Sequence, residues 1–285
     1  MRIVIGVDWS DEAFAAVRQA LLLYRPSEVT IVHGIEMGIF EYPAVAQLAS
    51  LQGYEEFRSA VIAAGEQLLD RTAETLSATS ASVKRINDIG NPAQMIVDAA
   101  QREKADLAVV GARGRSRVAE AFLGSVSHRV LTNSPCTTLI VRGETRKVRR
   151  VLVAVEAKED AARIVQWLKT HPFTGSVELC ILSVVVPIRV DDPYMVAGLQ
   201  SWSSISKTYA EDLVKSVAAS LLAPAYSVRT CVATGEAAAT VVEQGKDQDL
   251  IVVATHSRHG LDRFLLGSVS HSIVHRADKP VLVVH

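Results

Sequence analysis

The stretch Gly111–Ser127, GARGRSRVAEAFLGSVS, decides the fold assignment of this chain. It follows an apolar run, Leu107–Val110, which is typical of a buried parallel strand that ends at a turn. Gly111 and Gly114 predict a sharp turn with the positive φ that favours glycine and with a backbone that comes close to a ligand. Nine residues after Gly114, a glycine-serine pair opens a predicted helix at Val126–Leu131. The order is therefore strand, glycine turn, basic loop and helix.

A helix that begins at Gly124 is a candidate phosphate site, because its first N–H groups are unpaired and the helix dipole is positive there. The hydroxyls of Ser125 and Ser127 are expected to add hydrogen-bond donors. Positive charge comes from three arginines in the loop: Arg113, Arg115 and Arg117. The alternative is a connection in which the glycines serve only the geometry of the turn.

The hexapeptide LGSVSH at Leu123–His128 recurs unchanged at Leu266–His271. The strand and helix patterns that precede the two copies follow the same order. The period is too long for a solenoid. We therefore expect two α/β domains of one fold, residues 1–143 and 149–285, joined by a basic linker within Arg142–Arg150.

Apolar runs and helix signals alternate along both halves, which predicts parallel sheets with right-handed crossovers. Strands are expected at Arg2–Val7, Val29–Ile35, Val83–Asn87, Asp106–Val110 and Thr137–Val141, and again at Val148–Glu156, Val177–Val186, Val228–Ala233, Asp249–Ala254 and Pro280–Val284. Helices are expected at Ala13–Leu23, Tyr54–Leu76, Pro92–Lys104, Asp160–Lys169 and Leu199–Leu222, and long loops at Glu36–Gly53 and after Pro187.

Composition excludes several classes of protein. A net charge of −1 and an aromatic fraction of 5% give no basis for nucleic-acid binding. No apolar run is long enough to span a bilayer, so no membrane partner is expected. The three cysteines have no short spacing and suit a reducing compartment. We expect a cytoplasmic protein.

Asp8 ends the first predicted strand and Gly111 ends the fourth. In open α/β sheets a ligand binds outside the carboxyl ends of the strands, where the strand order reverses. A carboxylate and a phosphate loop then share one crevice. Because the carboxylate would repel phosphates, Asp8 is expected to contact ribose hydroxyls or the adenine edge.

These motifs together resemble the universal stress protein family. The resemblance rests on Asp8 after an apolar strand, Gly90-Asn91-Pro92 before a helix, and the spacing GxxG, nine residues, G[ST]. It implies a tandem member with two doubly wound, open, parallel five-stranded sheets of order 3-2-1-4-5, similar to the adenine nucleotide alpha hydrolase fold. It also implies an internal pseudo-dimer in which Thr137–Val141 pairs with Pro280–Val284. A homodimer of whole chains stays open.

The resemblance implies ATP as the ligand, alone or with Mg²⁺. The expected site residues are Val7, Asp8, Gly34, Val110, Gly111, Arg113, Gly114, Arg115, Gly124, Ser125, Val126 and Ser127. Among these, Arg113 and Arg115 are added on the basis of charge. Gly34 departs from the branched residue that is usual in the family, which predicts a looser base pocket.

The second half keeps Gly267, Ser268 and Ser270. However, Ala254 and Ser257 replace the two loop glycines, and Glu156 stands in the place of Asp8. We expect this second site to be impaired.

Further interpretations compete with these. A zinc site is one alternative, suggested by four histidines: His256, His259, His271 and His275. Because no cysteine or nearby acid completes the ligand set, no metal ligand is predicted. Trp9 is expected to pack under the first helix, with stacking on a base as the alternative. The loop contains no evident general base, so no catalytic residue is predicted. The expected function is a nucleotide-dependent stress-response regulator, and the alternatives are a slow ATPase or phosphotransferase and a scaffold that binds no ligand.

Overall fold

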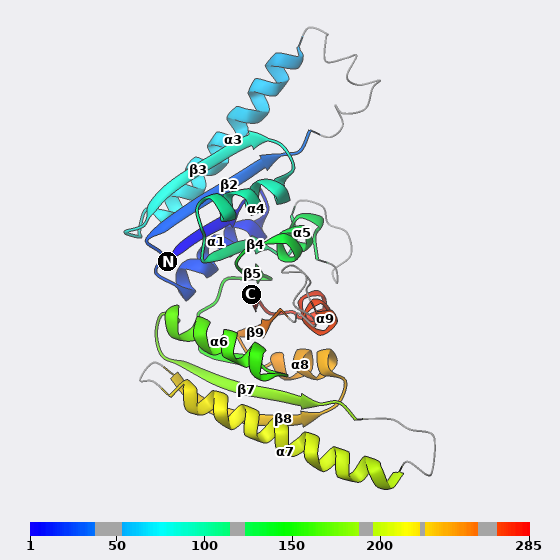
Figure 1. Ribbon diagram of the computed structural model, residues 1–285. Coiled ribbons are helices and arrows are strands. Elements are labelled where there is room, and N and C mark those ends of the chain that lie inside the picture. The colour runs from blue at the N-terminus through cyan, green and yellow to red at the C-terminus, as the bar shows by residue number, and fades with distance from the viewer. Residues whose placement is uncertain (38–52, 115–122, 188–195, 223–225, 256–266) are drawn as a thin grey trace. The chain divides into compact units, whose positions relative to one another are not determined.

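The protein is described by a computed structural model over residues 1–37, 53–114, 123–187, 196–222, 226–255 and 267–285. The chain forms two compact units. The first unit comprises Met1–Leu21 and Arg25–Thr145, and the second comprises Leu22–Tyr24 and Arg146–His285. The division after Thr145 falls within the predicted linker. Each unit contains five parallel strands flanked by helices (Figure 1).

The first unit is a parallel five-stranded sheet with the order β3-β2-β1-β4-β5, as predicted. Its strands are β1 (Arg2–Gly6), β2 (Glu28–Ile35), β3 (Ser82–Ile89), β4 (Leu107–Gly111) and β5 (Thr137–Val141). Its helices are α1 (Asp11–Leu23), α3 (Tyr54–Leu76), α4 (Pro92–Arg102) and α5 (Ser125–Asn133).

The second unit repeats this topology with the order β8-β7-β6-β9-β10. Its strands are β6 (Arg150–Ala154), β7 (Val177–Val185), β8 (Tyr226–Thr234), β9 (Leu250–Ala254) and β10 (Val281–Val284). Its helices are α6 (Lys158–Thr170), α7 (Val196–Ser220), α8 (Ala237–Gly245) and α9 (Ser268–Arg276). The pairing of Thr137–Val141 with Pro280–Val284 stays a prediction.

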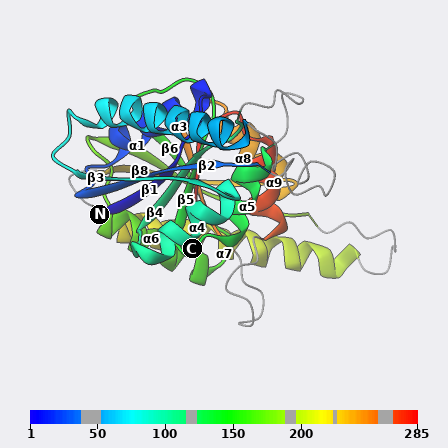
Figure 2. The same ribbon diagram turned by 90° about the horizontal axis from the view of Figure 1, so that it is seen from above.

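Helices cover both faces of the first sheet. α1 and α3 lie on one face, and α4 and α5 lie together on the other (Figure 2). The central strands β1 and β4 are sequestered between these layers, so the apolar residues Ile3–Ile5 and Leu107–Val110 are buried. This burial on two faces explains why both strands are continuous apolar runs.

Local signals in the sequence set several element boundaries. Asn91 caps α4, its side-chain oxygen accepting from the N–H of Gln94 at 3.1 Å, and Pro92 occupies the first helical position. The prediction for α3 agrees with its observed bounds.

In both units an aspartate carboxylate just before the fourth strand accepts a hydrogen bond from the first residue of the first strand. The Asp106 Oδ2 atom accepts from the backbone N–H of Arg2 at 2.6 Å, and Asp249 Oδ2 accepts from that of Arg150 at 2.9 Å. The repeat is therefore structural as well as sequential.

In the part of the chain that the structure describes, no helix combines the length and the apolar character that crossing a membrane requires.

Candidate functional site

A cleft of about 650 Å³ opens at the carboxyl ends of β1, β2 and β4 in the first unit. All the predicted site residues except Arg115 line it: Val7, Asp8, Gly34, Val110, Gly111, Arg113, Gly114, Gly124, Ser125, Val126 and Ser127. Arg115 and Arg117 lie outside the described residues. Residues that are far apart in the chain therefore meet at the point where the strand order reverses.

Asp8 is held in place from its own side of the cleft. Its Oδ1 atom accepts from the backbone N–H of Ser10 at 2.9 Å and from the Ser10 hydroxyl. The Ser10 hydroxyl oxygen in turn accepts from the N–H of Ala13 at 3.1 Å, which caps α1. The other oxygen, Oδ2, lies 2.6 Å from the place that a Cβ atom on Gly114 would occupy. The carboxylate therefore lies against the backbone of the glycine turn.

The structural reason for the loop glycines differs from the one predicted. Among the described glycines, those with a positive φ are Gly53, Gly143 and Gly175. Gly111 and Gly114 are not among them, so a left-handed backbone is not what selects glycine here. A Cβ atom on Gly111 would instead lie 3.0 Å from the backbone carbonyl carbon of Glu12. Close approach of the turn to α1 is what requires glycine.

The N-terminus of α5 faces the same cleft. Its N-cap is Gly124, which offers no side-chain cap, and the first intrahelical hydrogen bond runs from the N–H of His128 to the carbonyl of Gly124 at 2.9 Å. The N–H groups of the first turn precede that bond and have no partner within the helix. Such a group of donors is a physically suitable anion site.

The hydroxyl of Ser127 has a different role from the predicted one. It is buried and donates to the carbonyl of Gly111 at 2.5 Å, which ties α5 to the end of β4. The hydroxyl hydrogen is thereby used inside the fold, so we correct its assignment as a phosphate donor. The backbone N–H of Ser127 keeps that assignment, and Ser125 is exposed.

The pocket is not widened at Gly34, contrary to expectation. A Cβ atom there would lie 2.6 Å from the Cα atom of Pro92 and 3.1 Å from the sulfur of Met95. The start of α4 fills the space that a branched side chain would take.

Sequence analysis missed or misassigned several residues of the cleft. The Nδ1 atom of His33 lies 3.0 Å from the carbonyl oxygen of Val7, and because a carbonyl only accepts, Nδ1 carries the proton. Trp9 lines the cleft with 37% of its surface exposed and does not pack under α1 as predicted. Phe57 and Gly65 reach the cleft from α3. No spacing in the sequence indicated that α3 would contribute.

Glu12, in the first turn of α1, is a further residue that the sequence did not indicate as part of the site. Its Oε2 atom accepts from the backbone N–H of Arg113 at 2.7 Å, and its Oε1 atom lies 3.6 Å from the Nε atom of the same residue. The helix and the glycine turn are thus linked by one side chain.

The equivalent place in the second unit follows from strand register. The N–H of Val155 donates to the carbonyl of Leu182, just as the N–H of Val7 donates to the carbonyl of Val32. Glu156 therefore occupies the position of Asp8. The same register places larger side chains at glycine positions: Ala154 for Gly6, Val184 for Gly34 and Ala254 for Gly111. Ser257, the counterpart of Gly114, lies outside the described residues.

The start of α9 is nevertheless the same as that of α5. Its N-cap is Gly267, and the hydroxyl of Ser270 donates to the carbonyl of Ala254 at 2.7 Å. The second unit therefore keeps the helix end of the site and changes the strand ends.

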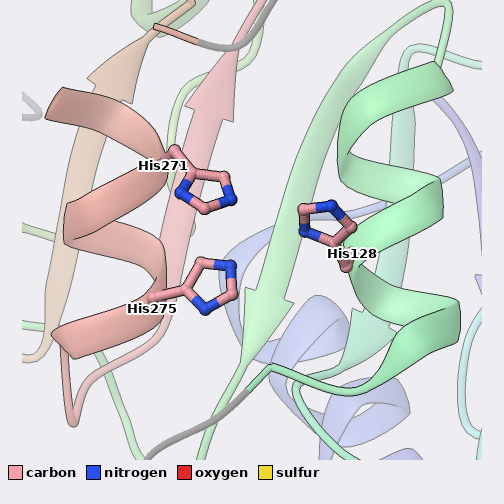
Figure 3. A group of neighbouring side chains, drawn as sticks. All are labelled: His128, His271 and His275. Atoms are coloured by element: carbon pink, nitrogen blue, oxygen red, sulfur yellow. The ribbon is translucent and has the colours of Figure 1, made fainter. Parts of the chain in front are cut away.

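The zinc interpretation concerns α9. The rings of His271 and His275 lie one turn apart on this helix with centroids 4.2 Å apart (Figure 3). His128 has the corresponding position in α5, where Thr132 follows one turn later. His256 and His259 lie outside the described residues. Two imidazoles supply only half of the four ligands that zinc usually takes, so α9 alone does not form a closed zinc centre.

Comparison with known proteins gives a consistent result. The sequence profile of the Universal stress protein family matches residues 1–142 and again 147–285. A universal stress protein of Mycolicibacterium smegmatis is 26% identical over 99% of this chain and 96% of its own length. The universal stress protein YxiE of Bacillus subtilis is 32% identical over 50% of this chain and 98% of its own length. The crystal structure of a universal stress protein from Archaeoglobus fulgidus aligns over 99% of this chain and 95% of its own, with a TM-score of 0.64 and 20% identity.

Proposed function

This chain belongs to the universal stress protein family as a tandem member, and we propose that its first unit binds one ATP molecule as the regulatory signal of a stress-response protein. The observation that carries the proposal is the cleft in which the glycine turn, the N-terminus of α5 and Asp8 face one another. The cleft volume of about 650 Å³ lies within the usual range for small-molecule sites.

The polar groups of the cleft fit the parts of a nucleotide. The N–H groups at the start of α5 suit the phosphates, because they provide donors and a positive dipole end. Asp8 is fixed by Ser10 and suits a ribose hydroxyl, which donates to a carboxylate. The backbone around Val7 and Gly34 borders the region left for the base. Mg²⁺, if it accompanies ATP, would be held mainly by the phosphates.

Binding is favoured over efficient catalysis by the chemistry of the described cleft. Hydrolysis of a γ-phosphate requires a residue that positions or deprotonates the attacking water. Asp8 accepts two hydrogen bonds from Ser10 through Oδ1, and its Oδ2 atom lies against Gly114 of the glycine turn. We propose that it positions the sugar.

The second unit is proposed to bind ATP weakly or not at all. Its strand ends carry Ala154, Val184 and Ala254 in place of glycines, and Glu156 carries an extra methylene compared with Asp8. In the first unit the matching glycines pack against Ile96, Pro92 and Glu12, so the larger side chains require the helices around the second cleft to be placed differently.

The direct test is to heat-denature the purified protein, identify any released nucleotide, and titrate ATP by calorimetry. We expect one site per chain. Asp8→Ala should weaken ATP binding by roughly 1.5–3 kcal/mol, about tenfold to a hundredfold, since it removes a hydrogen bond to a charged group. Single-turnover hydrolysis at saturating ATP is the control. Turnover at roughly 1 per second or faster in wild type that vanishes in a fully occupied Asp8→Ala protein would make Asp8 catalytic and the binding proposal wrong.

A further inference from the structure

Glu12 holds two different groups of one loop residue. Its Oε2 atom accepts from the backbone N–H of Arg113 at 2.7 Å, and its Oε1 atom lies 3.6 Å from the Nε atom of the Arg113 guanidinium. The side chains are 24% and 31% exposed, so water only partly screens the pair. A carboxylate that accepts from a backbone N–H forms one of the stronger hydrogen bonds in proteins.

The location of this contact lets it control the position of the glycine turn that lines the cleft. Arg113 lies between Gly111, which packs against the Glu12 backbone, and Gly114, which packs against the Asp8 carboxylate. A shift of the Arg113 N–H would therefore move the turn relative to both neighbours. Glu12 fixes the turn from the side of α1, and Asp8 meets it from the end of β1.

The charge of Glu12 acts in the opposite direction. Arg113 lines the cleft and is the described cation nearest to the turn glycines in sequence, but Glu12 already neutralises part of its charge. A carboxylate close to a phosphate site also repels each added phosphate. Glu12 therefore supports every nucleotide by positioning the turn and opposes the longer phosphate chains by its charge.

We propose that Glu12 is a positioning and specificity-determining residue of the first cleft, which holds the glycine turn and, through its pairing with Arg113, sets the preference among adenosine mono-, di- and triphosphate. This inference rests on the proposed binding of an adenine nucleotide.

The second unit contains a related link with different chemistry. Asp160 occupies the position of Glu12 and pairs with Arg163 of its own helix at 2.6 Å. Arg163 also donates to the carbonyl of Thr255, the residue after β9. An acid in the first turn of the helix is thus connected to the end of the fourth strand in both units. Among the described residues, the acid accepts directly from a backbone N–H of the loop in the first unit, where Glu12 holds Arg113 beside the glycine turn.

Two substitutions separate the two effects of Glu12. Glu12→Gln keeps an oxygen that accepts from the Arg113 N–H and removes the charge, whereas Glu12→Ala removes both. The affinities for AMP, ADP and ATP are measured by calorimetry for each variant. Glu12→Ala should weaken all three by about tenfold or more. Glu12→Gln should leave AMP within about threefold of wild type and raise the ratio of ATP to AMP affinity by about fivefold.

Asp11→Asn is the matched control. It makes the same change in net charge one residue earlier in α1, at an exposed side chain that does not line the cleft. It should change the ATP-to-AMP ratio by less than about twofold. A ratio raised equally by Asp11→Asn and Glu12→Gln would overturn the specificity role, since net charge alone would explain it. An unchanged ratio in a Glu12→Gln protein that binds both nucleotides would overturn it as well.

The positioning role is tested without any nucleotide. Hydrogen exchange of the Arg113 amide should be slow in wild type and Glu12→Gln, and about tenfold faster in Glu12→Ala. Equal exchange in wild type and in a folded Glu12→Ala protein would overturn the positioning role, whether or not nucleotide binds. A wild-type protein that binds no adenine nucleotide would instead overturn the proposed function, and the exchange rates would still decide whether Glu12 holds the turn.

Discussion

The two units begin their last helix in the same way but end their strands differently. α5 and α9 both have a glycine N-cap. In both, a buried serine hydroxyl donates to the carbonyl that ends the preceding strand, at 2.5 Å from Ser127 and 2.7 Å from Ser270. At the strand ends, by contrast, Gly34 and Gly111 of the first unit correspond to Val184 and Ala254 of the second.

This difference separates what the fold needs from what a ligand would need. The repeated hexapeptide LGSVSH is explained in part by this hydrogen bond from the serine hydroxyl to the strand carbonyl (the serine tie), which stabilises both units whether or not a ligand binds. The glycines at the strand ends let α1 and α4 come close to the sheet, and the second unit builds the same topology without them. The strand ends, more than the shared hexapeptide, therefore distinguish the two clefts.

Gly114→Val should have the largest effect. A Cβ atom there would lie 2.6 Å from the Oδ2 atom of Asp8, which Ser10 holds in place. We expect ATP affinity to fall by more than about a hundredfold, measured by calorimetry. Gly114→Ala should cost less in the Asp8→Ala background than alone, because the clashing atom is gone. Two equal ATP sites in wild type, or binding that survives Gly114→Val, would contradict the assignment of one competent cleft.

Gly34→Val gives the first unit the residue of the second. Its Cβ atom would meet the Cα atom of Pro92 at 2.6 Å, so α4 must move or the strand must strain. We expect the free energy of unfolding to fall by about 3 kcal/mol, the upper part of the range for overpacking. Urea unfolding measures it. The reverse change, Val184→Gly, should cost about 1 kcal/mol, because it only weakens a strand. Equal costs for the two changes would show that close packing of α4 does not explain Gly34.

Ser127→Ala and Ser270→Ala test the feature that the units share. Each removes one buried hydrogen bond to a strand carbonyl, and we expect each to lower the free energy of unfolding by about 1 kcal/mol. Thermal unfolding of the two variants measures the effect. A loss confined to Ser127→Ala would mean that the serine tie is not equivalent in the two units.

An effect of similar size, but with a different pH dependence in the two units, is expected at the caps of α4 and α8. Asn91→Ala should cost about 1 kcal/mol at every pH, because the cap is a neutral amide. In the second unit the carboxylate of Glu236 accepts from the N–H groups of Ala239 and Ala238, and these bonds lower the pKa of Glu236 below its ordinary 4.5. Its stabilisation is therefore present above pH 4.5 and is lost as the pH falls through the lowered pKa. The difference between wild type and Glu236→Ala, followed by urea unfolding from roughly pH 7 to 3, should shrink on acidification. A difference that is constant with pH would exclude the carboxylate as the cap.

The sequence by itself determined the features that depend on neighbouring residues. The apolar runs predicted the parallel strands, the period of apolar residues predicted α3 with its observed bounds, and the pair Asn91-Pro92 predicted the start of α4. The repeat of LGSVSH predicted two units of one fold. These features follow from local propensity, capping and burial patterns, which act within a few residues.

Tertiary structure decided how those elements meet. Gly111 faces Glu12, Gly34 faces Pro92, and Glu12 holds the N–H of Arg113, each across a long stretch of chain. The sequence gives no sign of these distances, since they depend on how closely each helix is set against the sheet. The expected positive φ at the loop glycines and the expected role of the Ser127 hydroxyl were wrong for the same reason. Both were inferred from residue type, whereas the packing of helix on strand fixed what each residue does.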